Sequence, residues 1–280
     1  MVLEAWDAFL DQAAAADLDR SSRLPGWRAH EICVHLGAWD DHQALADLIA
    51  SARSGGAGTP PDVDAVNARV TAAHREASRE EVLAALRRNR DATARYLSDE
   101  PVDLDTAPTV SVVGRLPLLS VVLGQAYELA VHGLDLVDCG AEPPPSSVLQ
   151  SGLAALADVT GALAASCDIT GGVTLAAPDG GWACAADPHG WTVRKTPPGR
   201  TEGPTVEAPA DLLLEAASGR VNPVAAVARR RLKVRDIGGL LRLAPIVQKS
   251  PGIPGGPILQ LAARTVGGAG GMLGRLFGKG

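Results

Sequence analysis

The sequence feature that most constrains the fold is a pair of ionisable residues inside an apolar segment near the middle of the chain. Glu128 and His132 are four residues apart, and residues 120–124 before them and 129–136 around them are mostly apolar. A helix places positions i and i+4 on one face about one turn apart, so these two side chains can hold one ion between them. His35, far upstream, is a third candidate ligand if a neighbouring helix presents it.

Three protein ligands would leave one coordination position of a metal open, as a catalytic metal needs, because water, a thiol or a substrate oxygen must enter there. The alternative is a chance Glu-x-x-x-His pattern in which each histidine is a structural residue. The apolar surroundings favour the metal site, because a carboxylate buried in such a segment costs free energy unless something pairs with it. The sequence therefore makes His35, Glu128 and His132 candidate ligands of a metal centre, with structural histidines as the alternative.

Length and charge distribution indicate two different domains. A chain of 280 residues suits one large or two ordinary domains. Residues 1–145 hold 23 acidic and 12 basic side chains, a net charge of -11, whereas residues 146–280 hold 9 and 14, a net charge of +5. Hydrophobic content of 46% with only 3% aromatic residues predicts cores packed mainly from alanine, leucine and valine.

The ends and the cysteines indicate a cytoplasmic protein. The first residues show no basic region followed by an apolar core, and no run of about eighteen uninterrupted apolar residues occurs, so we expect neither a signal peptide nor stable membrane insertion. The cysteines contain no C-x-x-C pair, which argues against a zinc knuckle or a dithiol redox motif. They are residues 33, 139, 167 and 184. We expect no nucleic-acid partner, because the basic run at residues 229–235 is more typical of a solvated element end than of an anion site.

The first half of the sequence predicts a bundle of four helices. A turn at residues 24–27 precedes the second helix, and a Gly/Pro loop at residues 54–61 ends it. The third helix has a break near Ser78, because Ser78-Arg79-Glu80-Glu81 resembles an N-terminal capping box. The predicted helices cover residues 2–17, 29–53, 64–98 and 118–137. Bundles of this kind often build metal centres from inward polar side chains.

The second half predicts a compact α+β unit after a linker at the three prolines 143–145. Short strand-like runs are separated by Asp-Gly and Pro-His-Gly turns, which indicates an antiparallel meander. The runs are residues 172–176, 182–186 and 191–195, and helices are expected at 148–165, 209–218 and 223–230. The predicted domains are 1–142 and 148–248, followed by a Gly/Pro-rich apolar tail at 251–280. This tail either docks on its own protein or is attracted to an anionic membrane surface.

Residues 24–27, 34–37 and 128–136 together resemble the mycothiol-dependent maleylpyruvate isomerase branch of the DinB-like metalloenzyme bundles. The resemblance covers roughly residues 1–140, and three separated ligand positions fall in their expected contexts. It implies that His35, Glu128 and His132 bind a metal, usually zinc, and that mycothiol is the thiol cosubstrate.

Residues from about 148 to 248 resemble a sterol carrier protein type two domain. Three segments carry this resemblance, at residues 219–227, 232–235 and 240–243. It implies a curved sheet and helices over an apolar cavity. The expected fold is therefore α+β, with an N-terminal DinB-like four-helix bundle followed by a sterol-carrier-like α/β domain.

Three further residues are candidates for the chemistry of the site. Gln125 stands where the isomerase branch often has an arginine suited to a substrate carboxylate, so a maleylpyruvate-like dicarboxylate is not the expected substrate unless Arg69 or Arg115 supplies the charge. His42 follows His35 by two turns of the predicted helix and is either a proton-transfer group or a polar bundle residue. Asp135 either orients a metal ligand or caps or solvates the helix end.

A thiol that enters an open metal position loses its proton, and the thiolate is the nucleophilic form. No cysteine of the chain lies within the triad, and Cys33 should point to a different helix face from His35, so the nucleophile would be external. We therefore expect a metal-dependent, mycothiol-type thiol transferase or isomerase that acts on a hydrophobic or electrophilic small molecule. The alternative is a non-catalytic carrier or sequestering protein for a hydrophobic small molecule, with a structural or vestigial metal.

Overall fold

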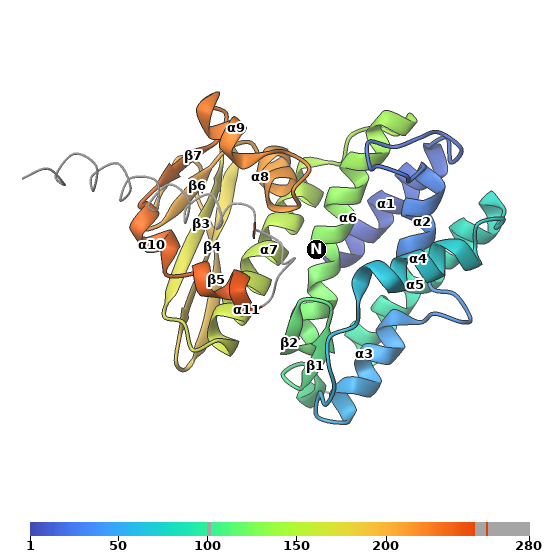
Figure 1. Ribbon diagram of the computed structural model, residues 1–280, viewed down its shortest axis with the longest axis horizontal. Helices are drawn as coiled ribbons and strands as arrows, with labels where there is room; N and C mark the ends of the chain where they lie inside the picture. Colours follow the sequence, from blue (N-terminus) through green and yellow to red (C-terminus); the bar gives the residue numbers. More distant parts are fainter. Residues whose placement is uncertain (100–101, 250–255, 257–280) are drawn as a thin grey trace, which may run out of the picture. The chain divides into compact units, whose positions relative to one another are not determined.

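The structure is a computed structural model that describes residues 1–99, 102–249 and 256 (Figure 1). The chain divides into two compact units, Met1–Ala155 and Leu156–Gly280. The first unit is mainly helical and the second contains a five-stranded sheet, so the predicted α+β class is confirmed. The predicted apolar tail, apart from residue 256, lies outside the described residues.

The first unit is built from α1 to α6 and a small hairpin. Helix α1 packs against α5 and α6, and α2 packs against α4, α5 and α6. Aliphatic and aromatic side chains on these inner faces are almost fully buried, including Trp6, Phe9, Ile32, Leu86 and Leu129. The elements are α1 (Val2–Ala15), α2 (Ala29–Leu36), α3 (Ala44–Arg53), α4 (Val63–Ala73), α5 (Arg79–Asp99), β1 (Pro108–Ser111), β2 (Gly114–Pro117) and α6 (Leu118–Leu136), with short 3₁₀ turns η1 (Val102–Leu104) and η2 (Val137–Cys139).

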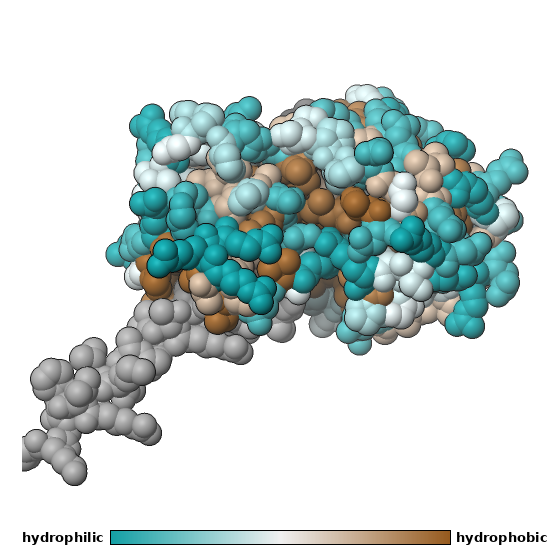
Figure 2. Space-filling view, turned by 90° about the horizontal axis from the view of Figure 1, so that it is seen from above, coloured by the Kyte–Doolittle hydropathy of each residue, from teal (hydrophilic) through white to brown (hydrophobic). Residues whose placement is uncertain are grey.

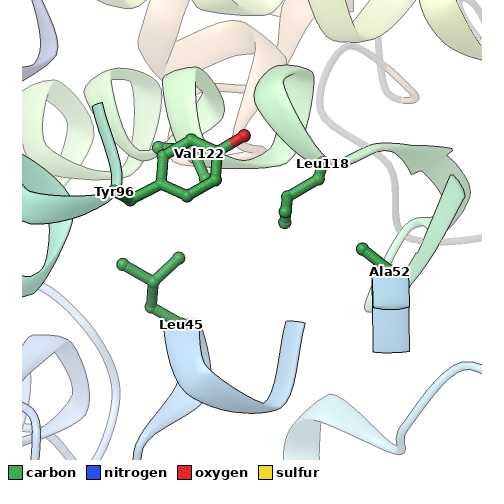
Figure 3. Close-up of a cluster of buried hydrophobic side chains, with 5 residues drawn as sticks. All are labelled: Leu45, Ala52, Tyr96, Leu118 and Val122. Atoms are coloured by element: carbon green, nitrogen blue, oxygen red, sulfur yellow. The ribbon is translucent and has the colours of Figure 1, made fainter. Parts of the chain in front are cut away.

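An apolar cluster joins α3 to α5 and α6. Figure 3 shows side chains from these three helices pointing toward one another, and all five are buried: Leu45, Ala52, Tyr96, Leu118 and Val122. The polar end of the Tyr96 ring is satisfied, because its hydroxyl donates a hydrogen bond to Asp105 (2.8 Å). Burial of this cluster stabilises the first turn of α6 and so positions the segment that leads to Glu128.

The prediction of one helix over residues 29–53 is wrong. Helix α2 ends at Leu36 and α3 begins at Ala44. Gly37 lies so close to α5 that an added Cβ would be 2.9 Å from the Ala85 Cβ, and the Trp39 indole donates to the carbonyl of Val34 (2.9 Å). The carbonyl of Val34 thus accepts a side-chain hydrogen bond near the end of α2, and a tight turn follows instead of another helical turn. Because α2 ends at Leu36, His35 and His42 do not share a helix face. That shared face was the reason for predicting His42 as a proton-transfer group.

The predicted break between α4 and α5 is confirmed, and its cause is the predicted capping box. The backbone N–H of Ser78 donates to the Glu81 carboxylate (2.7 Å), and the N–H of Glu81 donates to the Ser78 hydroxyl (3.3 Å). The guanidinium of Arg79, in the first turn of α5, donates to the carbonyl of Ala16 (2.9 Å) just after α1. The start of α5 therefore also caps the end of α1.

The second unit contains a five-stranded sheet with the order β5-β4-β3-β6-β7. The predicted antiparallel meander is confirmed as β3 (Gly171–Ala177), β4 (Gly180–Asp187) and β5 (Gly190–Thr196). Two further strands were not expected: β6 (Thr205–Glu207) pairs parallel with β3, and β7 (Lys233–Arg235) pairs antiparallel with β6. Helix α7 (Ser146–Ser166) begins in the first unit and ends in the second, and the other helices are α8 (Ala210–Ala217), α9 (Pro223–Ala228), α10 (Ile237–Leu241) and α11 (Ala244–Lys249).

Contacts of a tryptophan hold α7 against the meander. The Trp191 indole on β5 donates to Asp158 on α7 (2.8 Å). A Cβ at Gly161 would lie 2.7 Å from the same indole, so glycine allows the close approach. Part of the basic run also has a structural role, because Lys233 and Arg235 form ion pairs with Glu207 on the neighbouring strand (2.9 and 3.0 Å).

Helix α7 is the one helix of the described residues that is long and apolar enough to cross a membrane. In its most apolar stretch 72% of the residues are buried inside the protein, as in the core helix of a globular unit.

On the face shown in Figure 2, hydrophilic residues cover most of the described surface and apolar residues are exposed in smaller areas.

We predict that Ser78→Ala lowers the free energy of unfolding by about 1 kcal/mol, because it removes the hydroxyl that caps α5. The measurement is urea denaturation followed by helical circular dichroism. Ser98→Ala on the same helix is the matched control, since the Ser98 hydroxyl only bonds back to the carbonyl of Ala94 and such bonds contribute little. Equal effects of the two substitutions would contradict the capping box.

Candidate metal centre

The structure brings together the three predicted ligands. His35 comes from α2, and Glu128 and His132 come from α6, where they lie one turn apart. One ligand atom from each residue lies within 4.8 Å of the other two. The Glu128 carboxylate is 3.7 Å from Nε2 of His132, and the centroids of the two imidazole rings are 5.4 Å apart. Such spacing allows a single ion to reach all three side chains with small adjustments of rotamers.

Asp135 orients His132. Its side chain is fully buried, and one carboxylate oxygen is 3.0 Å from Nδ1 of His132. The other oxygen accepts a hydrogen bond from Nε of Arg23 (2.7 Å), which gives the buried carboxylate a charged partner. A hydrogen bond from Nδ1–H to the carboxylate leaves the lone pair on Nε2, the nitrogen that faces Glu128. Of the two roles predicted for Asp135, this geometry favours the orientation of a ligand.

The buried carboxylate of this segment is Asp135, not Glu128 as expected from the sequence. The Glu128 side chain is 46% exposed, whereas the Asp135 side chain is fully buried. Glu128 therefore does not need a cation to compensate for burial. Its candidacy as a ligand rests on its distance from the two histidines.

The aromatic ring of Trp27 lies beside the two histidines. Its ring stacks nearly parallel to that of His132, with centroids 6.5 Å apart and an angle of 5°. It meets the His35 ring edge-on at 5.5 Å. Neither Trp27 nor Arg23 was identified as a site residue from the sequence, although Trp27 lies in the turn at residues 24–27 that was noted there. Loop residues of this kind reach a site only through tertiary packing.

The remaining candidates Gln125, His42 and Arg115 have partners other than the three triad residues. The side-chain carbonyl of Gln125 accepts hydrogen bonds from the Trp6 indole (2.8 Å) and the Thr93 hydroxyl (3.0 Å), so it joins α6 to α1 and α5. His42 is half-buried in the turn after α2, where burial, followed by the charge of Arg69, lowers its pKa. Arg115 donates to the backbone carbonyl of Gly55.

The donor set of the triad fits a metal such as zinc. Two imidazole nitrogens and one carboxylate oxygen are the ligands that catalytic zinc sites commonly use, and they leave a position for an exogenous ligand. The carboxyl group that orients His132 is the partner that metal-binding histidines usually have. His35, Glu128 and His132 are therefore the residues that could hold the ion, with Asp135 and Arg23 behind them.

Buried cysteines do not supply a thiolate at neutral pH. Burial raises the pKa of Cys33 to about 12 and that of Cys184 to about 11, and it also raises the pKa of Cys139. Although Cys33 is on the same helix as His35, its side chain is fully buried. None of these three buried cysteines would therefore supply a nucleophilic thiolate to the triad.

Residues 2–137 match the family model described as the mycothiol maleylpyruvate isomerase N-terminal domain. The match covers 136 of 280 residues, just under half of the chain. It contains all three triad residues. No curated protein matches the sequence significantly.

Two crystal structures are similar to this chain, and both are of mycothiol-dependent maleylpyruvate isomerase. The first has a TM-score of 0.50 and 18% sequence identity, and the similarity covers 78% of this chain and 87% of that chain. The second is a histidine-to-alanine mutant with a TM-score of 0.48 and the same identity and coverage. At this identity the similarity concerns the fold alone.

We predict that the purified protein binds about one Zn²⁺ per chain and that His35→Ala or His132→Ala strongly lowers this occupancy, because two ligands hold the ion poorly against water. Metal analysis after dialysis measures the change. His42→Ala is the control and should keep its metal. Full occupancy in both triad variants would refute the assignment.

We predict that Asp135→Asn weakens zinc binding by about 10- to 100-fold, because the amide no longer holds His132 in the tautomer that presents Nε2. Competition with a chromogenic chelator measures the affinity. Asp138→Asn, at an exposed position three residues further on, should leave the affinity unchanged. An orienting role for Asp135 would be excluded if the two variants bound zinc equally.

Proposed function

We propose that this protein is a metal-dependent enzyme that uses mycothiol, or a related low-molecular-weight thiol, to transfer the thiol to an electrophilic small molecule or to isomerise that molecule. The observation that carries the proposal is the triad of His35, Glu128 and His132 beside an orienting carboxylate, within the segment that matches the isomerase family model.

The residues around the triad suit this chemistry. When bound, a divalent cation would lower the pKa of an incoming thiol and so favour the nucleophilic thiolate. Asp135 accepts the Nδ1–H of His132 and keeps Nε2 available. The Trp27 ring lies beside both histidines and adds an apolar surface there. Glu128, which is 46% exposed, lies on the side from which a ligand can enter.

Thiol transfer and isomerisation both begin with the same step, the attack of the thiolate sulfur on an electrophilic carbon. A new C–S bond forms at the electrophilic carbon, and in transfer the leaving group departs with the electron pair of the bond that breaks. In isomerisation the electron pair of a C=C bond moves onto the neighbouring group, the resulting single bond rotates, and the thiolate leaves again as the double bond reforms. The thiol is consumed in the first reaction and regenerated in the second.

The candidate metal ligands favour an enzyme over a non-catalytic carrier of a hydrophobic small molecule. Structural zinc sites normally have four protein ligands and are closed, whereas this triad has three candidate ligands and an exposed member. The first unit holds 155 of 280 residues, about 55% of the chain, so the 78% covered by the isomerase structure extends into the second unit. A second unit is therefore compatible with an enzyme of this fold. A sterol-carrier-like role of that unit stays a prediction.

Gln125 bears on the choice of substrate. Its carbonyl is engaged by Trp6 and Thr93, and the side chain is uncharged, so it offers no cation to a substrate carboxylate. We propose that the electrophile is not recognised through a charge at this position. A dicarboxylate such as maleylpyruvate is accordingly a poorer candidate than a neutral electrophile.

We predict that the Co²⁺-substituted protein develops a sulfur-to-metal absorption band when mycothiol is added, because the thiolate can occupy the open position. The His35→Ala variant should not show the band under the same conditions. Thiol-dependent consumption of electrophiles by the zinc-loaded protein is the second measurement. An unchanged spectrum at saturating thiol, with every electrophile inert, would favour the carrier alternative.

A further inference from the structure

A cleft in the first unit lies next to the triad but is separate from it. Its volume is about 740 Å³, and it is formed by the loop at residues 21–28, the first turns of α2, and the end of α4 with the residues after it. The charged and aromatic residues that line it are Arg23, Trp27, Arg28, Glu31 and Arg75, and Ala72 also lines it. Neither the sequence nor the family match assigns a ligand to this cleft.

The cleft connects to the metal ligands through shared residues. Trp27 lines it and also contacts the rings of His35 and His132. Glu31 lies four residues before His35 on α2, on the same helix face and about 6 Å along the axis. Arg23 lines the cleft and holds Asp135, which in turn orients His132. A ligand in the cleft would thus contact Trp27, which also contacts both histidines of the triad.

Most charges of the cleft are already neutralised within the protein. The Arg28 guanidinium donates to Glu31 (2.8 Å); this hydrogen bond raises the pKa of Arg28, and, against the effect of burial, the bonds from Arg28 lower the pKa of Glu31. Arg23 is paired with Asp135 (2.7 Å). Among the described residues Arg75 alone of these arginines has no ion pair.

This arrangement suits an uncharged ligand rich in hydroxyl groups better than an anion. Hydroxyl groups both donate and accept hydrogen bonds, and the cleft offers guanidinium donors beside carboxylate acceptors. An anion would face Glu31 and would gain one unpaired cation, Arg75, in an exposed place where charge interactions are weak. The Trp27 ring adds an apolar surface for the C–H face of a ring-shaped polyol.

We propose that this cleft binds the sugar part of the thiol cosubstrate. The proposal rests on the proposed function, and it adds the place where the non-reacting part of the cosubstrate is recognised. Mycothiol carries its cysteine on a glucosamine–inositol glycoside, an uncharged and hydroxyl-rich group. With this glycoside between the loop at 21–28 and α4, the cysteine would extend past Trp27 toward the triad.

Helix α4 offers a way to test the cleft without disturbing the core. Val70 is the buried residue of this helix, and Ala72 and Ala73 are both exposed at its end. Ala72 lines the cleft, whereas Ala73 is not among its lining residues. A large side chain at position 72 should therefore fill the cleft, and the same side chain at position 73 should not.

The test compares Ala72→Trp with Ala73→Trp in the zinc-loaded full chain by titration calorimetry with the N-acetylglucosaminyl-inositol glycoside, which has no thiol and no free amine. We expect binding with a dissociation constant on the order of millimolar or tighter, weakened at least about tenfold by Ala72→Trp and unchanged by Ala73→Trp. No binding to the native protein, or equal binding by both variants, would overturn the proposal.

A second titration separates this proposal from the proposed function. A small thiol such as 2-mercaptoethanol should bind the Co²⁺-substituted protein equally well in both variants, because it does not reach the cleft. Small-thiol binding without glycoside binding would refute the cleft and leave the function standing. Glycoside binding that is lost in Ala72→Trp, without any thiol band, would support the cleft and refute the thiol chemistry.

Discussion

The buried carboxylate of Asp135 is the interaction on which the arrangement of the candidate site depends. A fully buried carboxylate is stable only with partners, and those of Asp135 include the guanidinium of Arg23 at 2.7 Å and the imidazole of His132 at 3.0 Å. These bonds fix the direction of His132 and draw the loop that carries Arg23 onto α6. The same loop brings Trp27 against His132. One desolvated charge thereby links a candidate metal ligand, the Trp27 ring and the margin of a cleft.

The sequence predicted the parts of the site that depend on local geometry. Glu128 and His132 could be paired because four residues on a helix always give one face, and the start of α5 could be placed because Ser78 and Glu81 satisfy each other's backbone groups. The meander of β3, β4 and β5 followed from turns between short strands for the same reason. His35 could be named only as a candidate that a neighbouring helix would have to present, and the resemblance strengthened it, since no local rule brings α2 to α6.

The features that the sequence did not predict depend on contacts between distant segments. Helix α2 stops at Leu36 because Gly37 lies against Ala85 of α5 and the Trp39 indole takes the carbonyl of Val34, and no residue pattern within 29–53 announces either contact. The hairpin of β1 and β2 and the strands β6 and β7 have only three or four residues each, too few for a reliable period of two. The roles of Arg23 and Trp27 likewise appear only after the loop has folded onto α6.

The early end of α2 also shapes the chemistry that the site can perform. On an uninterrupted helix, His42 would have continued the line from His35 and offered a proton-transfer group beside the metal ligands. The turn after Leu36 instead places it where Arg69, Asp47, Asp41 and His74 are the charged groups that act on its pKa. On the other side of His35 the helix is regular, and Glu31 extends its face toward the cleft. Under the proposed function, this start of α2 is the end that the thiol cosubstrate would approach.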